Sequence, residues 1–225
     1  MNCCSPSGYE SIFGAKTAQR DARRDRRKGL ADTAAWLRDS LIAGGVAGTS
    51  VLEVGGGIGA LQMELVGAGA GAATNLELVD SYEAAAHDLI AERGLEGQIT
   101  RRIGDVVAEP ALVPSADVVV MHRVICCYPD AERLVAEGCE HAYDRIAITI
   151  PRERWWLRLG FGAMNTFWRL RRVDFRSYVH PVATIVATAR SHDFYVRTET
   201  SGPIWQSLVL QRSTNPSRTG GSSWQ

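Results

Sequence analysis

Three consecutive glycines at residues 55–57 constrain the fold of this 225-residue chain more than any other feature. The six residues before them (TSVLEV, 49–54) are β-branched and apolar, which predicts a buried strand. The residues after them (IGALQMELVGAG) are compatible with a helix. A strand that ends in glycines and leads into a helix brings free backbone N–H groups and the positive end of the helix dipole to one point. The sequence therefore predicts a strand–loop–helix unit with room for a nucleotide or a carboxylate beside the loop.

The alternation of strands and helices continues along the chain. Further strands are predicted at residues 74–79, 98–103, 116–121, 145–150, 195–200 and 207–211, and helices at 14–28, 30–43, 81–93, 130–142 and 183–190. The run at 116–121 is strongly apolar, which is typical of a central parallel strand buried on both faces. No helix separates the last two strands, so they should form an antiparallel hairpin. We expect an α/β fold with a Rossmann-like, mostly parallel seven-stranded sheet, an antiparallel C-terminal hairpin and helices on both faces.

Composition and charge indicate one ordinary folded domain with local features. The chain is 45% hydrophobic and 22% charged, and its 25 Lys and Arg balance 25 Asp and Glu, so no overall field favours nucleic acid as a partner. Residues 14–28 carry seven Lys or Arg against two Asp. We expect a basic helical cap at 1–45, a main domain at 46–212 with an aromatic and arginine-rich insertion at 152–180, and a disordered polar tail at 213–225. The oligomeric state stays open.

Cysteine usage and the N-terminus favour a cytoplasmic protein with reduced thiols. Four of the five cysteines form two adjacent pairs, Cys3-Cys4 and Cys126-Cys127, which is not a disulfide framework. Adjacent cysteines also chelate one ion poorly, so we predict no metal site. No apolar run approaches the length needed to cross a bilayer, and the first residues do not resemble a signal peptide.

The glycine spacing by itself has two interpretations. Gly55, Gly57 and Ala60 satisfy the G-x-G-x-x-G/A pattern of dinucleotide-binding proteins, and Asp80 follows at the expected separation. An NAD(P)-dependent oxidoreductase therefore stays open. Glu53 argues for another ligand, because dinucleotide folds usually carry an apolar residue there. An acid at this point can anchor the loop or attract an ammonium group.

Polar residues follow each of the next predicted strands. The two oxygens of Asp80 suit both hydroxyls of a ribose, and Asp105, after the third strand, suits an adenine amino group. His122 ends the fourth strand. Because open α/β sheets bind ligands at the carboxyl ends of their strands, these side chains should face one crevice.

Taken in order, the stretch EVGGGIG (53–59), Asp80, the Gly104-Asp105 pair and the closing hairpin resemble the class I S-adenosylmethionine-dependent methyltransferases over roughly residues 49–212. The resemblance implies S-adenosyl-L-methionine as the cofactor, with the glycine loop on its methionine part, Asp80 on the ribose and Asp105 on the adenine. The residues expected to contact the cofactor are Glu53, Gly55, Gly56, Gly57, Gly59, Asp80, Ser81, Asp105, Val106 and His122.

Three more segments are similar, more weakly, to the magnesium-protoporphyrin O-methyltransferases: residues 12–37, 124–130 (VICCYPD) and 180–194. That family has a catalytic histidine before its Tyr-Pro pair, whereas this chain has Cys127 before Tyr128. We expect methyl transfer to a small hydrophobic acceptor, with oxygen slightly favoured as the methylated atom. His122, Cys127 and Tyr128 are the expected catalytic residues. The substitution at Cys127 also keeps open a methyltransferase-like binding module without catalysis.

The insertion has a distinctive composition. Residues 152–176 interleave seven arginines with six aromatic side chains directly after the fifth predicted strand. Three interpretations stay open: a lid over a flat or lipid-like substrate, a helix lying on a membrane surface, and an amphipathic helix that packs its aromatic residues on the domain.

Overall fold

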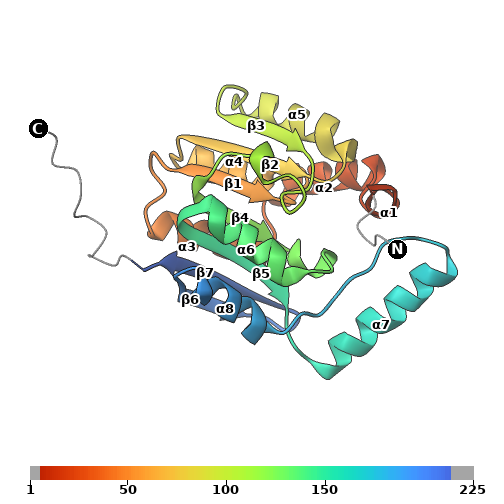
Figure 1. Cartoon of the computed structure of the whole chain (residues 1–225). Coiled ribbons are helices and arrows are strands. Elements are labelled where there is room, and N and C mark those ends of the chain that lie inside the picture. Colours follow the sequence, from red (N-terminus) through yellow and green to blue (C-terminus); the bar gives the residue numbers. More distant parts are fainter. Residues whose placement is uncertain (1–5, 214–225) are drawn as a thin grey trace, which may run out of the picture.

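The structure is a computed structural model that describes residues 6–213. These residues form one seven-stranded sheet in the order β3-β2-β1-β4-β5-β7-β6 (Figure 1). The strands are β1 (Ser50–Val54), β2 (Ala72–Glu77), β3 (Ile99–Ile103), β4 (Ala116–His122), β5 (Ala142–Pro151), β6 (Phe194–Ser201) and β7 (Trp205–Arg212). Strand β7 runs antiparallel to its neighbours β5 and β6, and the other neighbouring pairs are parallel. The predicted fold class is confirmed.

Helices cover both faces of the sheet. One face packs against α3 (Asp32–Ala43), α4 (Ala60–Gly67) and α5 (Glu83–Glu92), and the other against α6 (Ala131–His141) and α8 (Val182–Ser191) (Figure 1). Neighbouring residues of β1 show this arrangement, since Val51 packs in the first layer and Leu52 in the second. Alternate side chains of a strand point to opposite faces, so an unbroken apolar strand is buried on both.

Local sequence signals set several helix ends. Asp130 precedes α6, and its carboxylate accepts the backbone N–H of Arg133 at 3.0 Å, which satisfies one of the free N–H groups of the first turn. Helix α2 (Ala15–Lys28) ends at Gly29, whose φ of 66° lies in the left-handed region that glycine tolerates.

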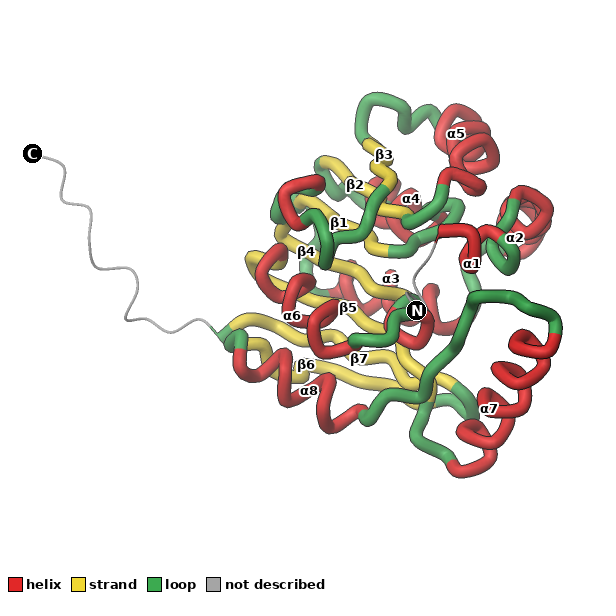
Figure 2. The backbone as a smooth tube through the Cα atoms, turned by 45° about the vertical axis from the view of Figure 1, so that its right-hand side comes forward, coloured by secondary structure: helices red, strands yellow, loops and turns green. Residues whose placement is uncertain are grey.

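Three helices gather at the end of the sheet where the parallel strands finish. Figures 1 and 2 show α1 (Pro6–Glu10), α2 and α7 (Trp155–Leu170) on this side of the molecule. Helix α1 was not predicted. Helix α7 stands away from the sheet, and Leu157 is its only buried residue. No helix of the described chain is long and apolar enough to span a membrane.

The second strand differs from its predicted position. It was expected at residues 74–79 but runs from Ala72 to Glu77, because its pairing with β1 ends where the glycines begin: Gly55 donates its N–H to the Leu76 carbonyl at 2.8 Å. The expected place of Asp80 at the strand end is therefore wrong. The Cys3-Cys4 pair and the predicted tail beyond Ser213 lie outside the described residues.

Candidate functional site

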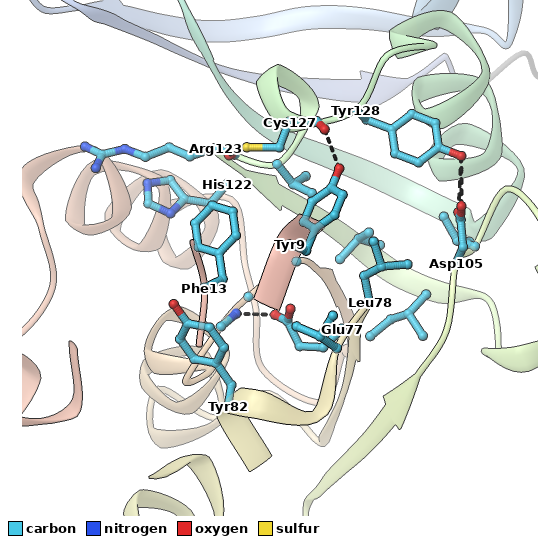
Figure 3. Close-up of a pocket in the computed structure, with 18 of the residues that line it drawn as sticks. Tyr9, Phe13, Glu77, Leu78, Tyr82, Asp105, His122, Arg123, Cys127 and Tyr128 are labelled. Carbon is cyan, nitrogen blue, oxygen red and sulfur yellow. Dashed lines mark hydrogen bonds between the residues drawn. The ribbon is translucent and has the colours of Figure 1, made fainter. Parts of the chain in front are cut away.

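A pocket of about 250 Å³ opens at the carboxyl ends of β1, β2, β3 and β4 (Figure 3). Its walls come from residues 54–58, 76–79, 104–106 and 122–124, which follow or end these four strands. Tyr9 and Phe13 from the N-terminal segment and Cys127 and Tyr128 from the loop after β4 also line it. The parallel strands thus bring residues far apart in the sequence to one crevice, as the topology requires.

The structure divides the ten residues expected to contact a cofactor into two groups. Those that line the pocket are Gly55, Gly56, Gly57, Asp105, Val106 and His122, and those that do not are Glu53, Gly59, Asp80 and Ser81. The three expected catalytic residues, His122, Cys127 and Tyr128, all line it. The residues of 55–57 and those that end or follow the third and fourth strands are thus brought together, whereas Gly59 and the residues expected after the second strand are not.

Both close contacts and backbone conformation require glycine in the loop. A Cβ atom on Gly56 would lie 2.4 Å from the amide nitrogen of Asn75 and 2.6 Å from the carboxylate of Glu53, so no larger residue fits. Gly57 has a φ of 61°, a conformation that side chains disfavour. The triple glycine is therefore a steric requirement, and it leaves the loop backbone open to the pocket.

Glu53 lies beneath this loop. Its side chain is buried in β1, and its carboxylate accepts the backbone N–H of Gln62 in α4 at 3.3 Å. Burial raises the pKa of Glu53 to about 7. Side-chain polar atoms of Gln62 and Asn75 around it are buried and have no hydrogen-bond partner among residues 6–213. Glu53 thus supports the loop from below and does not face the pocket.

Glu77 is the acidic residue of the second strand that lines the pocket. It is the last residue of β2, and its carboxylate accepts the backbone N–H of Gly57 (Figure 3). Burial raises the pKa of Glu77 to about 7, against the opposing influence of that hydrogen bond and of Arg101. The sequence points to Asp80 in place of Glu77, because the strand predicted at 74–79 ends two residues later than β2 does. Asp80 instead begins the 3-10 helix η1 (Asp80–Tyr82) and is exposed.

The segments that follow β3 and β4 meet where the Tyr128 hydroxyl lies within 3.3 Å of both carboxylate oxygens of Asp105. The Tyr128 hydroxyl donates to an Asp105 carboxylate oxygen at 3.0 Å, and the other oxygen of Asp105 accepts the backbone N–H of Val107 at 2.9 Å. Val106 is buried beside them. The pocket therefore presents a carboxylate next to an apolar side chain on this side.

His122 occupies the opposite side of the pocket. Its Nε2 atom lies 3.0 Å from the Thr33 hydroxyl. Burial, and secondly the positive charge of Arg123, lower the pKa of His122 to about 3. The imidazole is therefore neutral at pH 7 and is a weak base.

Cys127 faces the pocket as a neutral thiol. Its sulfur lies 3.8 Å from that of Cys126, in a loop that includes the 3-10 helix η3 (Ile125–Cys127). The hydrogen bond with Cys126 and burial raise the pKa of the Cys127 thiol well above its ordinary value. The site therefore holds no strong base at His122 or Cys127.

An aromatic cluster of Tyr9, Phe13 and Phe175, which the sequence did not predict, borders the pocket. The Tyr9 hydroxyl donates to the backbone carbonyl of Cys127, which ties α1 to the loop after β4 (Figure 3). Phe175 is buried, and its ring lies 5.3 Å from the rings of both Tyr9 and Phe13. Only their apolar character was visible in the sequence, since contacts over such separations leave no local pattern.

Comparison with known proteins gives one family and many similar structures. A family profile described as an O-methyltransferase domain matches residues 6–150. The magnesium protoporphyrin IX methyltransferase ChlM from Synechocystis PCC 6803, solved with bound SAH, is 21% identical, with 87% of each chain covered and a TM-score of 0.65.

Two further structures have the same fold. An O-methyltransferase family protein from Burkholderia thailandensis is 18% identical over 91% of this chain and 63% of that chain, with a TM-score of 0.68. A protein described as a putative sarcosine dimethylglycine methyltransferase from Galdieria sulphuraria is 14% identical over 80% and 85%, with a TM-score of 0.64. A search of curated protein sequences finds no match.

Proposed function

The chain belongs to the O-methyltransferase domain family, and from this premise we propose that it methylates an oxygen atom of a small, flat, apolar acceptor that carries an acidic group. Members of this class use S-adenosyl-L-methionine, whose sulfonium supplies an activated methyl group when the cofactor is bound. Family membership confirms the predicted enzyme class and sets aside the NAD(P)-dependent oxidoreductase. The acceptor, the ligand contacts and the methylated atom belong to the proposal.

The pocket residues fit this cofactor. Backbone groups of Gly55 and Gly57 border the pocket without side chains, which suits close approach by an amino acid carboxylate. Glu77 and Asp105 stand at the ends of adjacent strands. In the proposal, the loop binds the methionine part, Glu77 accepts from the ribose hydroxyls and Asp105 accepts from the adenine amino group.

The position of Glu77 is the observation that carries the proposal. Its carboxylate lines the pocket and accepts the Gly57 N–H, so the same residue contacts both the glycine loop and the space for the ligand. Asp80 is exposed and does not line the pocket, so the ribose role expected for it passes to Glu77.

The protonation states near His122 and Cys127 favour an acidic acceptor. A neutral imidazole with a pKa of about 3 and a thiol with a raised pKa do not remove a proton readily from an alcohol. A carboxylate or an acidic phenol is already ionised at neutral pH and needs no such base. The aromatic rings of Tyr9 and Phe13 suit a flat acceptor, and the chain's main contribution to rate is then to hold donor and acceptor in line in a dry pocket.

Calorimetry and a transfer assay test the proposal. The full-length protein is titrated with S-adenosylhomocysteine, with NADH and NADPH as parallel titrants, and only the first should bind. Methyl-labelled cofactor is then offered with a panel of aromatic and porphyrin carboxylates, each paired with its amide as a matched acceptor that lacks the ionised oxygen. Label should appear on the carboxylates alone. Binding without transfer to any acceptor would favour the non-catalytic binding module, and transfer to the amides would refute the acidic-acceptor argument.

A further inference from the structure

We propose that the face formed by α7 and α2 around the pocket docks on the surface of an anionic lipid bilayer. Three features of the described chain support this docking: an exposed apolar stripe on α7, two separate arginine-rich groups, and the contacts that link α7 to the pocket.

The apolar stripe is the first feature. The exposed fractions along α7 are 73% for Trp155, 43% for Trp156, 65% for Leu159, 53% for Phe167 and 79% for Leu170. These are five of the ten exposed large apolar residues in the described part of the chain, and they lie within one 16-residue helix. From Trp156 to Leu170 they recur at spacings of three or multiples of four residues, which puts them on one side of the helix. Clustered exposure of this kind marks an interaction surface, whereas single exposed apolar residues do not.

Positive charge flanks the stripe. Residues 152–176 contain seven arginines against two acids, and Arg154, Arg158 and Arg169 are exposed on α7 or at its start. A helix with Trp, Phe and Leu on one side and arginines beside them has the composition of a helix that lies in the interface of an anionic membrane. The apolar side chains enter the boundary of the acyl chains and the guanidinium groups reach the headgroups.

A second basic surface lies on the same side of the molecule. Helix α2 exposes Arg20, Arg23, Arg24 and Arg27, and both views place α2 and α7 at the end of the sheet where the pocket opens (Figures 1 and 2). The neutral chain thus concentrates positive charge around its pocket. An extended anionic surface contacts both helices at once, and each nearby Lys or Arg strengthens such binding about fivefold.

Charge and apolar character together favour a bilayer over two other possible partners of this face, a second copy of the chain and a single-stranded nucleic acid. A second copy of the chain paired along α7 would bring arginines of both helices together, in either direction, because Arg154 and Arg169 lie at opposite ends. A single-stranded nucleic acid satisfies the arginines and stacks on aromatic rings, but it leaves the aliphatic side chains of Leu159 and Leu170 in water. An anionic bilayer surface accommodates both the arginines and the apolar side chains.

Packing connects the inner side of α7 to the pocket. Trp168, on the inner side of α7, lies 4.9 Å from the Phe175 ring, and Phe175 packs on Tyr9 and Phe13, which line the pocket. A bilayer bound by the stripe therefore lies on the far side of α7 from the aromatic cluster, one helix diameter of about 10 Å away from it. Resting on the proposed function, this arrangement indicates that an apolar acceptor reaches the pocket from the lipid phase.

Vesicle co-sedimentation of the full-length protein tests the proposal. We expect binding to vesicles of phosphatidylcholine with phosphatidylglycerol, weak binding to phosphatidylcholine alone, and loss of binding at high salt. The variant Leu159→Ser with Phe167→Ser should bind at least about tenfold more weakly, since it removes two buried apolar contacts. The matched control, Tyr143→Ser with Tyr195→Ser, removes two exposed aromatic residues on β5 and β6 and should bind as the wild type does.

The charge contribution is tested in the same assay. Arg154→Ala with Arg169→Ala should weaken binding about 25-fold, whereas Arg190→Ala with Arg197→Ala, a pair of exposed arginines on α8 and β6, should have no effect. S-adenosylhomocysteine binding is measured by calorimetry for the wild type and each variant. Retained cofactor binding without sedimentation would overturn the docking proposal alone, and sedimentation without cofactor binding would refute the proposed function alone. Equal sedimentation with neutral vesicles, or binding of α7 to single-stranded RNA in place of vesicles, would also overturn it.

Discussion

Replacing Glu77 by glutamine should make the ligand-free protein more stable while weakening its binding of S-adenosylhomocysteine. The carboxylate of Glu77 is buried and has a pKa raised to about 7. Glutamine has nearly the same shape, keeps an oxygen that accepts the Gly57 N–H, and removes the cost of burying a charge. It also removes the charged acceptor that we propose for the ribose hydroxyls.

The size of the stability change follows from the pKa shift. The folded-state pKa of about 7 lies above the ordinary value of 4.5, so the folded protein holds the Glu77 proton more tightly than the unfolded chain does. Stability from this group is therefore fully present below pH 4.5 and is lost as the pH rises through 7. The shift corresponds to about 3 kcal/mol at pH 8, where both states are ionised, and to about 1 kcal/mol at pH 5.

Urea denaturation at the two pH values measures this difference. The Glu77→Gln variant should have a larger free energy of unfolding than the wild type at pH 8, and the gap should shrink at pH 5. Calorimetry should show a loss of about 1–3 kcal/mol in binding of S-adenosylhomocysteine. Asp80→Asn is the matched control, because this acid is exposed and outside the pocket, and it should change neither quantity. A stability gap that does not depend on pH, or an unchanged affinity, would refute the reasoning.

Three further predictions concern the loop, the aromatic cover and the pocket histidine. Gly56→Ala should destabilise the protein by roughly 1–3 kcal/mol and abolish S-adenosylhomocysteine binding, because its Cβ meets the Asn75 amide; urea denaturation and calorimetry measure both, and intact binding would contradict it. Tyr9→Phe should lower the free energy of unfolding by about 1 kcal/mol through loss of the bond to the Cys127 carbonyl; an unchanged denaturation midpoint would argue against that bond. His122 should not titrate between pH 5 and 8 in NMR spectra, and its contribution to stability should be present above pH 6.5 and lost as the pH falls toward 3; an observed pKa near 6.5 would disprove its burial as a neutral group.

The sheet could be predicted because its signals are local. The run TSVLEV, the three glycines and the apolar strand at 116–121 each carry a period or a break that short-range sterics explain, and β1 and β4 are found within a residue of the expected ranges. Strand ends are less determined. In the stretch NLELVD (75–80) every residue up to Val79 is compatible with a strand, and only pairing with β1 decides that it stops at Glu77.

That two-residue difference decided which acid reaches the pocket. Side chains of a strand alternate in direction, and a residue beyond the strand end is free to turn to the surface, as Asp80 does. Asp105 has no such ambiguity, because Gly104 directly follows β3 and fixes its position at the pocket. When a site residue is identified by its position after a strand, the prediction is therefore only as accurate as the predicted end of that strand.

For the aromatic cluster at the pocket and for helix α7, the sequence shows the composition but does not show in which direction each side chain points. Arginines and aromatic residues at 152–176 predicted an amphipathic segment, but packing on the domain accounts for only part of it. Leu157 is buried and Trp168 contacts Phe175, so the inner side of the helix already has its partners. Leu159 and Phe167 lie on another side and are more than half exposed. One apolar face explains the folding of α7, and the second, exposed face is the one for which we propose the bilayer surface, which is why the vesicle assay addresses that face directly.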